Sequence, residues 1–270
     1  MKILFIILTL LFLPTVGFCT NYGNDANCMG YWAMEEGFSA GTDNETDLSG
    51  EGGTLVETSG DIPNSADKMF GSYSRDFELG DSEYLTHADG GSTDISGADQ
   101  AISFICFYKS ENADQTNEEV LIGKYDNVNS DIQYTLYIAT TGDVATLRLS
   151  SDGASTSSAV GATDIGTNWR GIAAVYNDTD IRIYLDGSLD SNGSSNPRVY
   201  SGGIFNANEP FYIGVHLKAG NLDEYADGLI DDAAVFNRAL TSVEVADINT
   251  NGVQGSAPPA TVGKVIMISG

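Results

Sequence analysis

Histidine, cysteine and basic residues are all scarce in this sequence of 270 residues. It contains 2 His and 3 Cys, and 12 Lys and Arg residues stand against 38 Asp and Glu residues, a formal net charge of -26. A surface this negative repels phosphate backbones and anionic lipid, which excludes nucleic-acid binding by counterion release. Without a CxxC motif or a His-rich cluster, the sequence indicates neither a zinc site nor a redox site. Two histidines also leave little for histidine-based catalysis.

The first twenty residues are not expected to belong to the fold. Lys2 precedes an apolar run over residues 3–16, and small or polar residues follow. This order predicts a secretory signal peptide over residues 1–19, cleaved after Cys19. The run is short for a membrane span, so we expect a protein that is secreted or displayed at the cell surface, with no membrane insertion after cleavage. A lipoprotein anchor at Cys19 is the alternative, although Phe18 occupies a position where a small residue is expected.

Two cysteines, Cys28 and Cys106, remain after removal of the leader. In an oxidising compartment they can pair as a disulfide, which typically stabilises a fold by about 2–4 kcal/mol. Cys106, however, lies inside the apolar run 102–108, where a free cysteine packs as a small hydrophobic side chain. The sequence leaves both alternatives open.

Short runs rich in β-branched and aromatic residues recur along the chain, separated by Gly, Asn and Asp. The predicted strands cover residues 29–34, 72–79, 84–87, 101–109, 119–125, 134–140, 145–150, 169–176, 180–185, 211–215 and 229–236. This spacing predicts an all-β antiparallel sandwich of two sheets over residues 20–254. Alternation places Ile181 and Ile183 on a buried face of their strand, and Tyr184 on the exposed face.

One helix is predicted near the C-terminus. Thr241 can cap it and Glu244 can reciprocate in a capping box, and Gly252 is a natural stop. Residues 255–270 are expected to form a linker with two adjacent prolines and an apolar tail. That tail can dock on the sandwich, pair with another chain or remain a free end.

Several short motifs occur in an order that resembles a known family. They are Tyr31–Gly37, Asp47–Gly50, Phe70–Gly71, Phe77–Gly80, Ile102–Phe107, Trp169–Tyr176, Ile183–Gly187, Gly228–Asp232 and Phe236–Leu240. The series is similar to the concanavalin A-like lectin/glucanase superfamily, and in particular to its laminin-G-like domains. The resemblance covers most of residues 31–252. It implies a jelly-roll of two antiparallel sheets, one of them concave and often carrying the ligand.

The resemblance also implies a structural Ca2+ on the edge away from the concave face. The positions that match the family's ligands are Glu35 or Glu36, the carbonyl of Gly71, and Asp231. A hard cation of this kind takes six to eight oxygen ligands, including carboxylates and backbone carbonyls. The alternative is that these acidic residues are ordinary turn and surface carboxylates.

Catalysis is not expected. The glucanase branch of the family carries Glu-x-Asp-x-x-Glu on a central strand, and neither this pattern nor a Gly-x-Ser-x-Gly elbow occurs in the sequence. Sugar binding instead uses aromatic faces and planar polar groups. The candidate ligand-binding residues are Tyr184, on the outward face of its strand, and Asp223 and Tyr225, in an acidic loop before the last strand. Trp32 and Trp169 are assigned to packing.

These observations lead to two functional hypotheses. The first is an exported, non-catalytic, lectin-like recognition domain that is stabilised by Ca2+ and binds a glycan or a partner surface. The second is a structural subunit of an extracellular appendage, sheath or virion surface, in which the C-terminal tail pairs with a neighbour to form a homo-oligomer or polymer.

Overall fold

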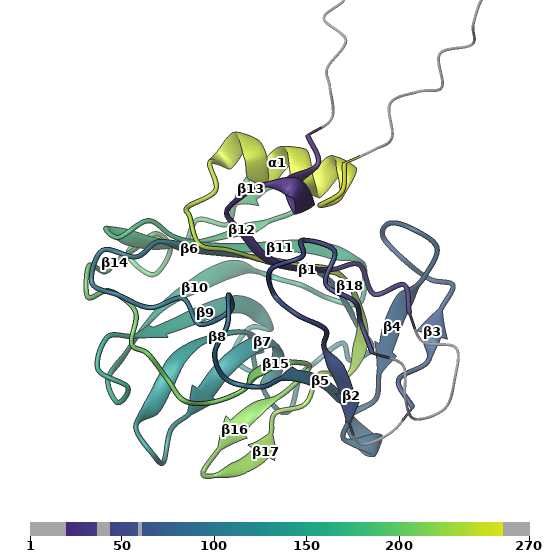
Figure 1. Ribbon diagram of the computed structural model, residues 1–270, viewed down its shortest axis with the longest axis horizontal. Helices are drawn as coiled ribbons and strands as arrows, with labels where there is room; N and C mark the ends of the chain where they lie inside the picture. The colour runs from purple at the N-terminus through teal and green to yellow at the C-terminus, as the bar shows by residue number, and fades with distance from the viewer. Residues whose placement is uncertain (1–19, 37–43, 59–60, 256–270) are drawn as a thin grey trace, which may run out of the picture.

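Two β-sheets lie face to face, and one helix covers the outer side of one of them (Figure 1). The architecture is seen in a computed structural model, which describes residues 20–36, 44–58 and 61–255. The predicted all-β antiparallel sandwich is confirmed. The predicted leader and the predicted apolar tail, residues 1–19 and 256–270, lie outside the described residues.

Nine strands form the sheet under the helix, which we call sheet 1. Its main path runs β13 (Ser188–Leu189), β12 (Asp180–Leu185), β11 (Arg170–Tyr176), β6 (Ile102–Ser110), β18 (Gly228–Phe236), β4 (Ser74–Phe77) and β3 (Asn64–Ser65). In addition, β1 (Cys28–Trp32) pairs with β18, and β14 (Arg198–Val199) pairs with β12. Strand β18 therefore touches β6, β4 and β1, and it joins the beginning of the described chain to its end.

Nine further strands form the opposite sheet, sheet 2. Its path runs β10 (Thr156–Asp164), β9 (Val144–Ser150), β8 (Asp131–Ala139), β7 (Glu119–Asp126), β15 (Phe211–Ile213), β5 (Tyr84–His87) and β2 (Val56–Thr58). The hairpin of β16 (His216–Lys218) and β17 (Asn221–Asp223) lies beside β7, and its β16–β7 bridge is parallel. Two short 3-10 helices, Tyr22–Asn24 and Leu79–Asp81, complete the described elements.

The main hydrophobic core fills the space between the sheets. Phe104, Ile183 and Ile230 reach it from sheet 1, while Leu136 and Leu147 reach it from sheet 2. All five side chains are buried. Side chains alternate between the two faces of a strand, so the residues between these core positions belong to the outer faces of the sandwich.

Helix α1 (Ser242–Asn251) is the single predicted helix, and its N-terminal cap is confirmed. The Thr241 hydroxyl accepts from the Glu244 backbone N–H at 3.2 Å, and the Glu244 carboxylate accepts from the Thr241 N–H at 2.7 Å. Gly252 follows as the C-cap. The helix buries Val245 and Ile248 in a second hydrophobic cluster on the outer face of sheet 1.

This second cluster corrects the prediction for Tyr184. Its side chain points away from the main core, as the alternation predicted, but it is only 4% exposed and packs in the cluster beneath α1. Alternation identifies the outward face of a strand, yet it does not show whether another element covers that face. Tyr184 therefore offers no surface to a ligand.

The two cysteines are also separated by sheet 1. Cys28 lies in the cluster beneath the helix, Cys106 lies in the core between the sheets, and both are free and fully buried. Their side chains therefore point to opposite faces of one sheet, and the disulfide alternative is wrong. Burial raises the pKa of the Cys28 thiol to about 12 and also raises that of Cys106, which keeps both sulfurs protonated and unreactive.

A thiol titration checks this arrangement. In the native protein cleaved after residue 19, we expect Cys28 and Cys106 to react with a thiol reagent only slowly, because both are buried. In guanidinium without reductant, both should react at once. If one thiol or none appeared after denaturation in the absence of reductant, the two cysteines would be oxidised and the separation across sheet 1 would be incorrect.

Candidate functional site

A β-bulge in the middle of β18 places two carboxylates side by side in the interior. The register of β18 against β6 shifts between Asp231 and Ala234, and Asp232 adopts a left-handed backbone with a φ of 45°. The side chains of Asp231 and Asp232 are 0% and 4% exposed. An ionised group that is this buried requires hydrogen bonds or a cation as compensation.

Hydrogen bonds from distant parts of the chain reach both carboxylates. Asp231 Oδ2 accepts from the backbone N–H groups of Met69 and Phe70, each at 2.8 Å. Asp232 accepts from the Tyr31 hydroxyl at 2.6 Å and from the Val253 N–H at 3.1 Å. The bulge therefore ties the first strand, the loop around residue 70 and the segment after α1 to one point.

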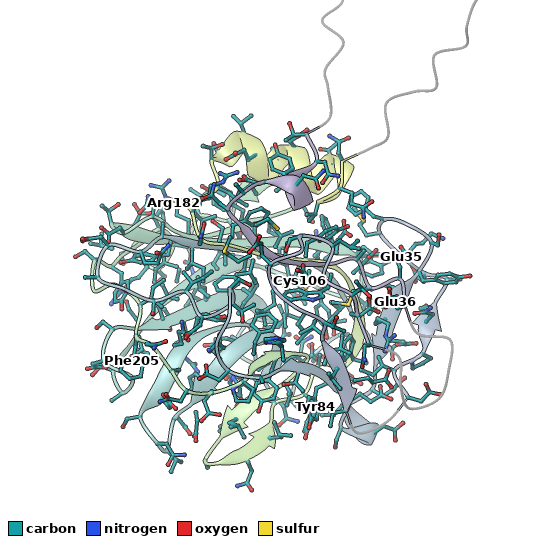
Figure 2. The ribbon with its side chains drawn as sticks, in the orientation of Figure 1. Glu35, Glu36, Tyr84, Cys106, Arg182 and Phe205 are labelled. Atoms are coloured by element: carbon teal, nitrogen blue, oxygen red, sulfur yellow. The ribbon has the colours of Figure 1, made fainter. Side chains whose placement is uncertain are left out.

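Glu35 and Gly71 lie against the same loop. Glu35 Oε1 accepts from the Ser72 N–H at 2.7 Å, and a Cβ added at Gly71 would lie only 1.7 Å from that oxygen. With a φ of 58°, Gly71 also adopts a backbone that favours glycine. Glu36 is directed elsewhere, because its carboxylate accepts from the Thr46 hydroxyl at 3.0 Å. Figure 2 shows the two neighbouring glutamates.

The electrostatics of this region favour a cation. Burial raises the pKa of Asp231 to about 7, with further contributions from Asp232 and Glu35, and burial raises the pKa of Asp232 to about 6. Asp231 Oδ1 is buried without a hydrogen-bond partner. A cavity of about 370 Å³ adjoins Glu35, Gly71 and Asp232, and the C-terminal end of α1 contributes Asn251 to its wall. The negative end of the helix dipole adds to the attraction for a cation.

Another acidic cluster lies near the start of β18 and was not singled out as a metal site in the sequence. Among the described residues, Glu78, Glu111 and Asp227 offer carboxylate oxygens within 4.8 Å of one another. Glu35, Asp231 and Asp232 are not gathered this closely. The residues around Asp231 thus fit a cation through an unpartnered buried oxygen and converging negative charge, rather than through a closed set of carboxylates.

A second candidate site lies on the outer face of sheet 2. The Arg148 guanidinium, on β9, donates to the Tyr137 hydroxyl at 2.6 Å and to the Tyr125 hydroxyl at 3.3 Å. It lies over both rings, 4.7 Å from the Tyr137 centroid and 5.5 Å from that of Tyr125. Tyr125 in turn stacks on the His216 ring at 4.4 Å. A row of aromatic and cationic groups therefore crosses β8, β9, β7 and β16.

Glu224 completes this row with negative charge. Its Oε2 lies 2.6 Å from Nε2 of the buried His216, and its other oxygen contacts the Lys218 ammonium. Burial acts to raise the pKa of Glu224, but the contacts with His216 and Lys218 outweigh it and lower that pKa to about 2. Glu224 also has a φ of 60°, a left-handed backbone that is uncommon for a residue with a side chain and that often occurs at functional sites.

A polar pocket of about 200 Å³ opens at this end of the row. It is lined by Thr116, Asn117, Glu118, Thr140, Lys218, Asp223 and Glu224. The structure thus brings Asp223 and Glu224, both from the acidic segment before the last strand, together with Glu118 and Lys218, which the sequence analysis did not single out. Tyr225 is instead half-buried in an aromatic cluster with Tyr84 and Tyr212, and it does not line the pocket.

Two local features of the sequence could have indicated Arg148, His216 and Lys218. Arg148 is the single charged residue within the apolar strand β9, at a position that faces away from the core. His216 and Lys218 alternate on the short strand β16. Neither signal identifies Glu118 as a neighbour of Glu224, because these two residues are more than one hundred positions apart in the sequence.

Glu118, just before β7, and Glu119, its first residue, lie in different surroundings. Glu118 lines the pocket, whereas Glu119 is 3% exposed and accepts from the Tyr108 hydroxyl at 2.7 Å, which links β7 to sheet 1. Burial raises the pKa of Glu119 to about 7. Because its folded pKa lies above its unfolded value, the protonated form stabilises the fold, and this contribution is lost as the pH rises through about 7.

Replacing Glu119 by glutamine should therefore change the pH dependence of stability. The wild type should lose stability as the pH rises from 4.5 to 8, because Glu119 ionises, whereas Glu119→Gln should not. The unfolding free energy of the variant minus that of the wild type should therefore increase by up to about 3 kcal/mol over this range, at about 1.36 kcal/mol per pKa unit. Urea unfolding at several pH values measures this difference. Glu51→Gln, at an exposed position, serves as the control. Parallel curves for the wild type and Glu119→Gln would contradict the assignment.

In its described residues the protein is a two-sheet antiparallel jelly-roll with one short α-helix, which is the architecture of lectin-like sandwich domains. The family model for the concanavalin A-like lectin/glucanases superfamily, of the laminin G type, matches residues 79–246. This match spans more than half of the sequence, so the chain belongs to that superfamily. No curated protein matches the sequence.

Solved structures agree on the fold. Domain 4 of AbnA, an extracellular arabinanase from Geobacillus stearothermophilus, in complex with arabinotriose, aligns with a TM-score of 0.58 and 18% identity, over 83% of this chain and 98% of that domain. The binding domain of botulinum neurotoxin DC, in complex with rat synaptotagmin II, aligns with a TM-score of 0.60 and 13% identity, over 83% of this chain and 51% of that one.

The ligand-binding domain of botulinum neurotoxin serotype D, in complex with N-acetylneuraminic acid, aligns with a TM-score of 0.54 and 12% identity, over 83% of this chain and 50% of that one. The chain thus spans about half the length of these toxin domains. Within the part of the chain that the structure describes, no helix has the length and apolar character needed to cross a membrane.

Proposed function

We propose that this protein is an exported, non-catalytic, lectin-like domain that binds a glycan through the polar pocket on the outer face of sheet 2. The observation that carries the proposal is the convergence of Glu118, Asp223, Glu224 and Lys218 on one pocket beside a row of tyrosines and Arg148. Carboxylate and ammonium groups can bond pairs of sugar hydroxyls, and the buried tyrosines Tyr125 and Tyr137 hold Arg148 in place beside the pocket. Family membership and the arabinotriose and sialic-acid complexes of similar folds support this assignment.

Export is supported by the predicted leader and by the extracellular setting of the similar arabinanase domain. A non-catalytic role is supported by the contacts of Glu118 and Glu224, whose carboxylates are already engaged by neighbouring side chains. Glu224 already contacts His216 and Lys218 and shares a hydrogen bond with Glu118. Glycoside hydrolysis requires a free pair of carboxylates, separated by about 5–5.5 Å or about 6.5–9.5 Å.

A Ca2+ ion at the β18 bulge is the second part of the proposal. Asp231 would hold it through the unpartnered Oδ1, with Glu35, Asp232 and the carbonyl of Gly71 as the neighbouring oxygen donors. The ion would neutralise carboxylates that burial and mutual repulsion otherwise protonate near neutral pH. Its contribution is structural, because this point already joins β1, the loop around residue 70 and the end of α1.

Thermal unfolding tests the Ca2+ site. For chelator-treated protein at pH 7.5, we expect Ca2+ at about one hundred times its Kd to raise the Tm by about 5–10 °C. Asp231→Asn should abolish the rise. Glu36→Gln should retain it, because Glu36 is directed toward Thr46, and so should the exposed Asp114→Asn. An unchanged Tm in the wild type, or an equal rise in Asp231→Asn, would refute the site.

A glycan array tests the pocket. We expect the full-length protein to bind a defined subset of glycans, and Glu118→Gln and Asp223→Asn to weaken that binding about tenfold or more, since hydrogen bonds to charged groups contribute about 1.5–3 kcal/mol. Asp61→Asn, which is exposed and outside the pocket, is the matched control. Reducing-sugar release from any polysaccharide would contradict a non-catalytic role, and an array without specific signals would contradict glycan binding.

A further inference from the structure

A groove lies at the end of strands β8 and β9 that is opposite to the polar pocket. It is formed by the loop before β6, the turn after β9 and the loop before β15, and its volume is about 380 Å³. The pocket adjoins Thr140, which follows β8, whereas the groove adjoins Ser151, which follows β9. Because β8 and β9 are antiparallel, these two positions lie at opposite ends of the strand pair.

One aromatic side chain, Phe205, lies half-buried along this groove. Its backbone N–H donates to the Ser150 carbonyl at 2.8 Å, which fixes it to the end of β9. Its ring lies against Gly153, where an added Cβ would be 2.8 Å from the ring and 2.1 Å from the Ser130 carbonyl. Figure 2 shows Phe205 at the periphery of the molecule. The ring therefore has a built support on one side and the groove on the other.

The backbone of the groove is held in place before any ligand arrives. Gly97 and Ile204 exchange two backbone hydrogen bonds of 2.8 and 2.9 Å. A Cβ at Gly203 would lie 2.5 Å from the Gly97 carbonyl, so the two loops approach as closely as glycine allows. The Tyr200 hydroxyl donates to the Gly203 carbonyl at 2.9 Å, and the Tyr176 hydroxyl accepts its N–H at 3.1 Å. Such prior ordering lowers the entropic cost of binding.

The groove differs in charge from the polar pocket, whose lining includes Glu118, Lys218, Asp223 and Glu224. Its walls are formed by Ser96, Gly97, Ala98, Ser151, Gly202, Ile204, Phe205 and Asn206, and none of these side chains is ionisable. In a chain with a net charge of -26, an uncharged surface depression of this size offers hydroxyl and amide groups beside one aromatic ring. This chemistry matches an uncharged sugar, whose ring has an apolar face and a rim of hydroxyl groups.

We propose that this groove, which we call the Phe205 groove, is a second binding site that takes an uncharged sugar ring stacked on Phe205. It goes beyond the charged pocket, because it shares no residue with it and requires no ionic contact. The protein would then engage a neutral oligosaccharide at one end of β8 and β9, independently of the ligand at the other end.

The test uses the full-length protein and a panel of immobilised uncharged oligosaccharides built from glucose, mannose, galactose, xylose and arabinose, followed by calorimetry with the strongest binder. We expect Phe205→Ala to weaken binding about tenfold, while Phe205→Tyr retains it. Ala98→Glu, which puts a charge on the exposed wall of the groove, should weaken binding, whereas Ala98→Ser should not. Raising NaCl to about 0.5 M should leave the affinity within about twofold, because no ion pair is involved.

Three outcomes decide the proposal. Selective loss of neutral-sugar binding in Phe205→Ala and Ala98→Glu, with unchanged binding in the exposed Asp61→Asn and an unchanged Tm, supports it. Loss in Asp223→Asn with full retention in Phe205→Ala overturns the groove and leaves the pocket as the proposed site. Capture of acidic glycans alone, or of no uncharged sugar, overturns the groove as well. Val243→Ala, at a 76% exposed position on α1, controls for general surface effects.

Discussion

Two adjacent buried carboxylates in β18 are the constraint on which the rest of this sandwich depends. Asp231 and Asp232 each receive two hydrogen bonds, and the donors come from β1, from the loop around residue 70 and from the segment after α1. Apolar replacements of similar size are often neutral or stabilising at buried charged positions, so stability alone does not account for keeping both groups. Their raised pKa values and the unpartnered Oδ1 of Asp231 are the observations on which the proposed Ca2+ site rests.

The two outer faces of the sandwich follow different physical rules. Sheet 1 presents apolar side chains outward and buries them under α1, which explains why Tyr184 and Cys28 are inaccessible. Sheet 2 presents Tyr137, Arg148 and His216 outward and satisfies them with hydrogen bonds, stacking and charge contacts. One face is therefore covered by apolar packing under a helix, whereas the other is closed by a network of polar and aromatic contacts.

Strand positions were largely predictable, and the misses have a common cause. Runs of β-branched and aromatic residues marked β6, β7, β11, β12 and β18 to within one or two residues. Strand β10, Thr156–Asp164, was missed because it is an edge strand of small and polar residues, and its sequence resembles a turn. Hydrogen bonds to β9 determine its conformation, and a pattern search within one segment does not detect a partner strand.

The sequence by itself determined the class of fold and the capped helix, and its family motifs singled out Glu35, Gly71 and Asp231, but not Tyr31, Asp232 and Val253, which also meet at the bulge. These features follow from local periodicity, from capping chemistry and from an ordered series of family motifs. Only the tertiary structure decided that Cys28 and Cys106 lie on opposite faces of a sheet, that Tyr184 is covered, and that Glu118 meets Glu224. Each of these facts depends on which distant segment packs against a strand. Side-chain alternation within the strand does not depend on that segment, so it cannot reveal which segment it is.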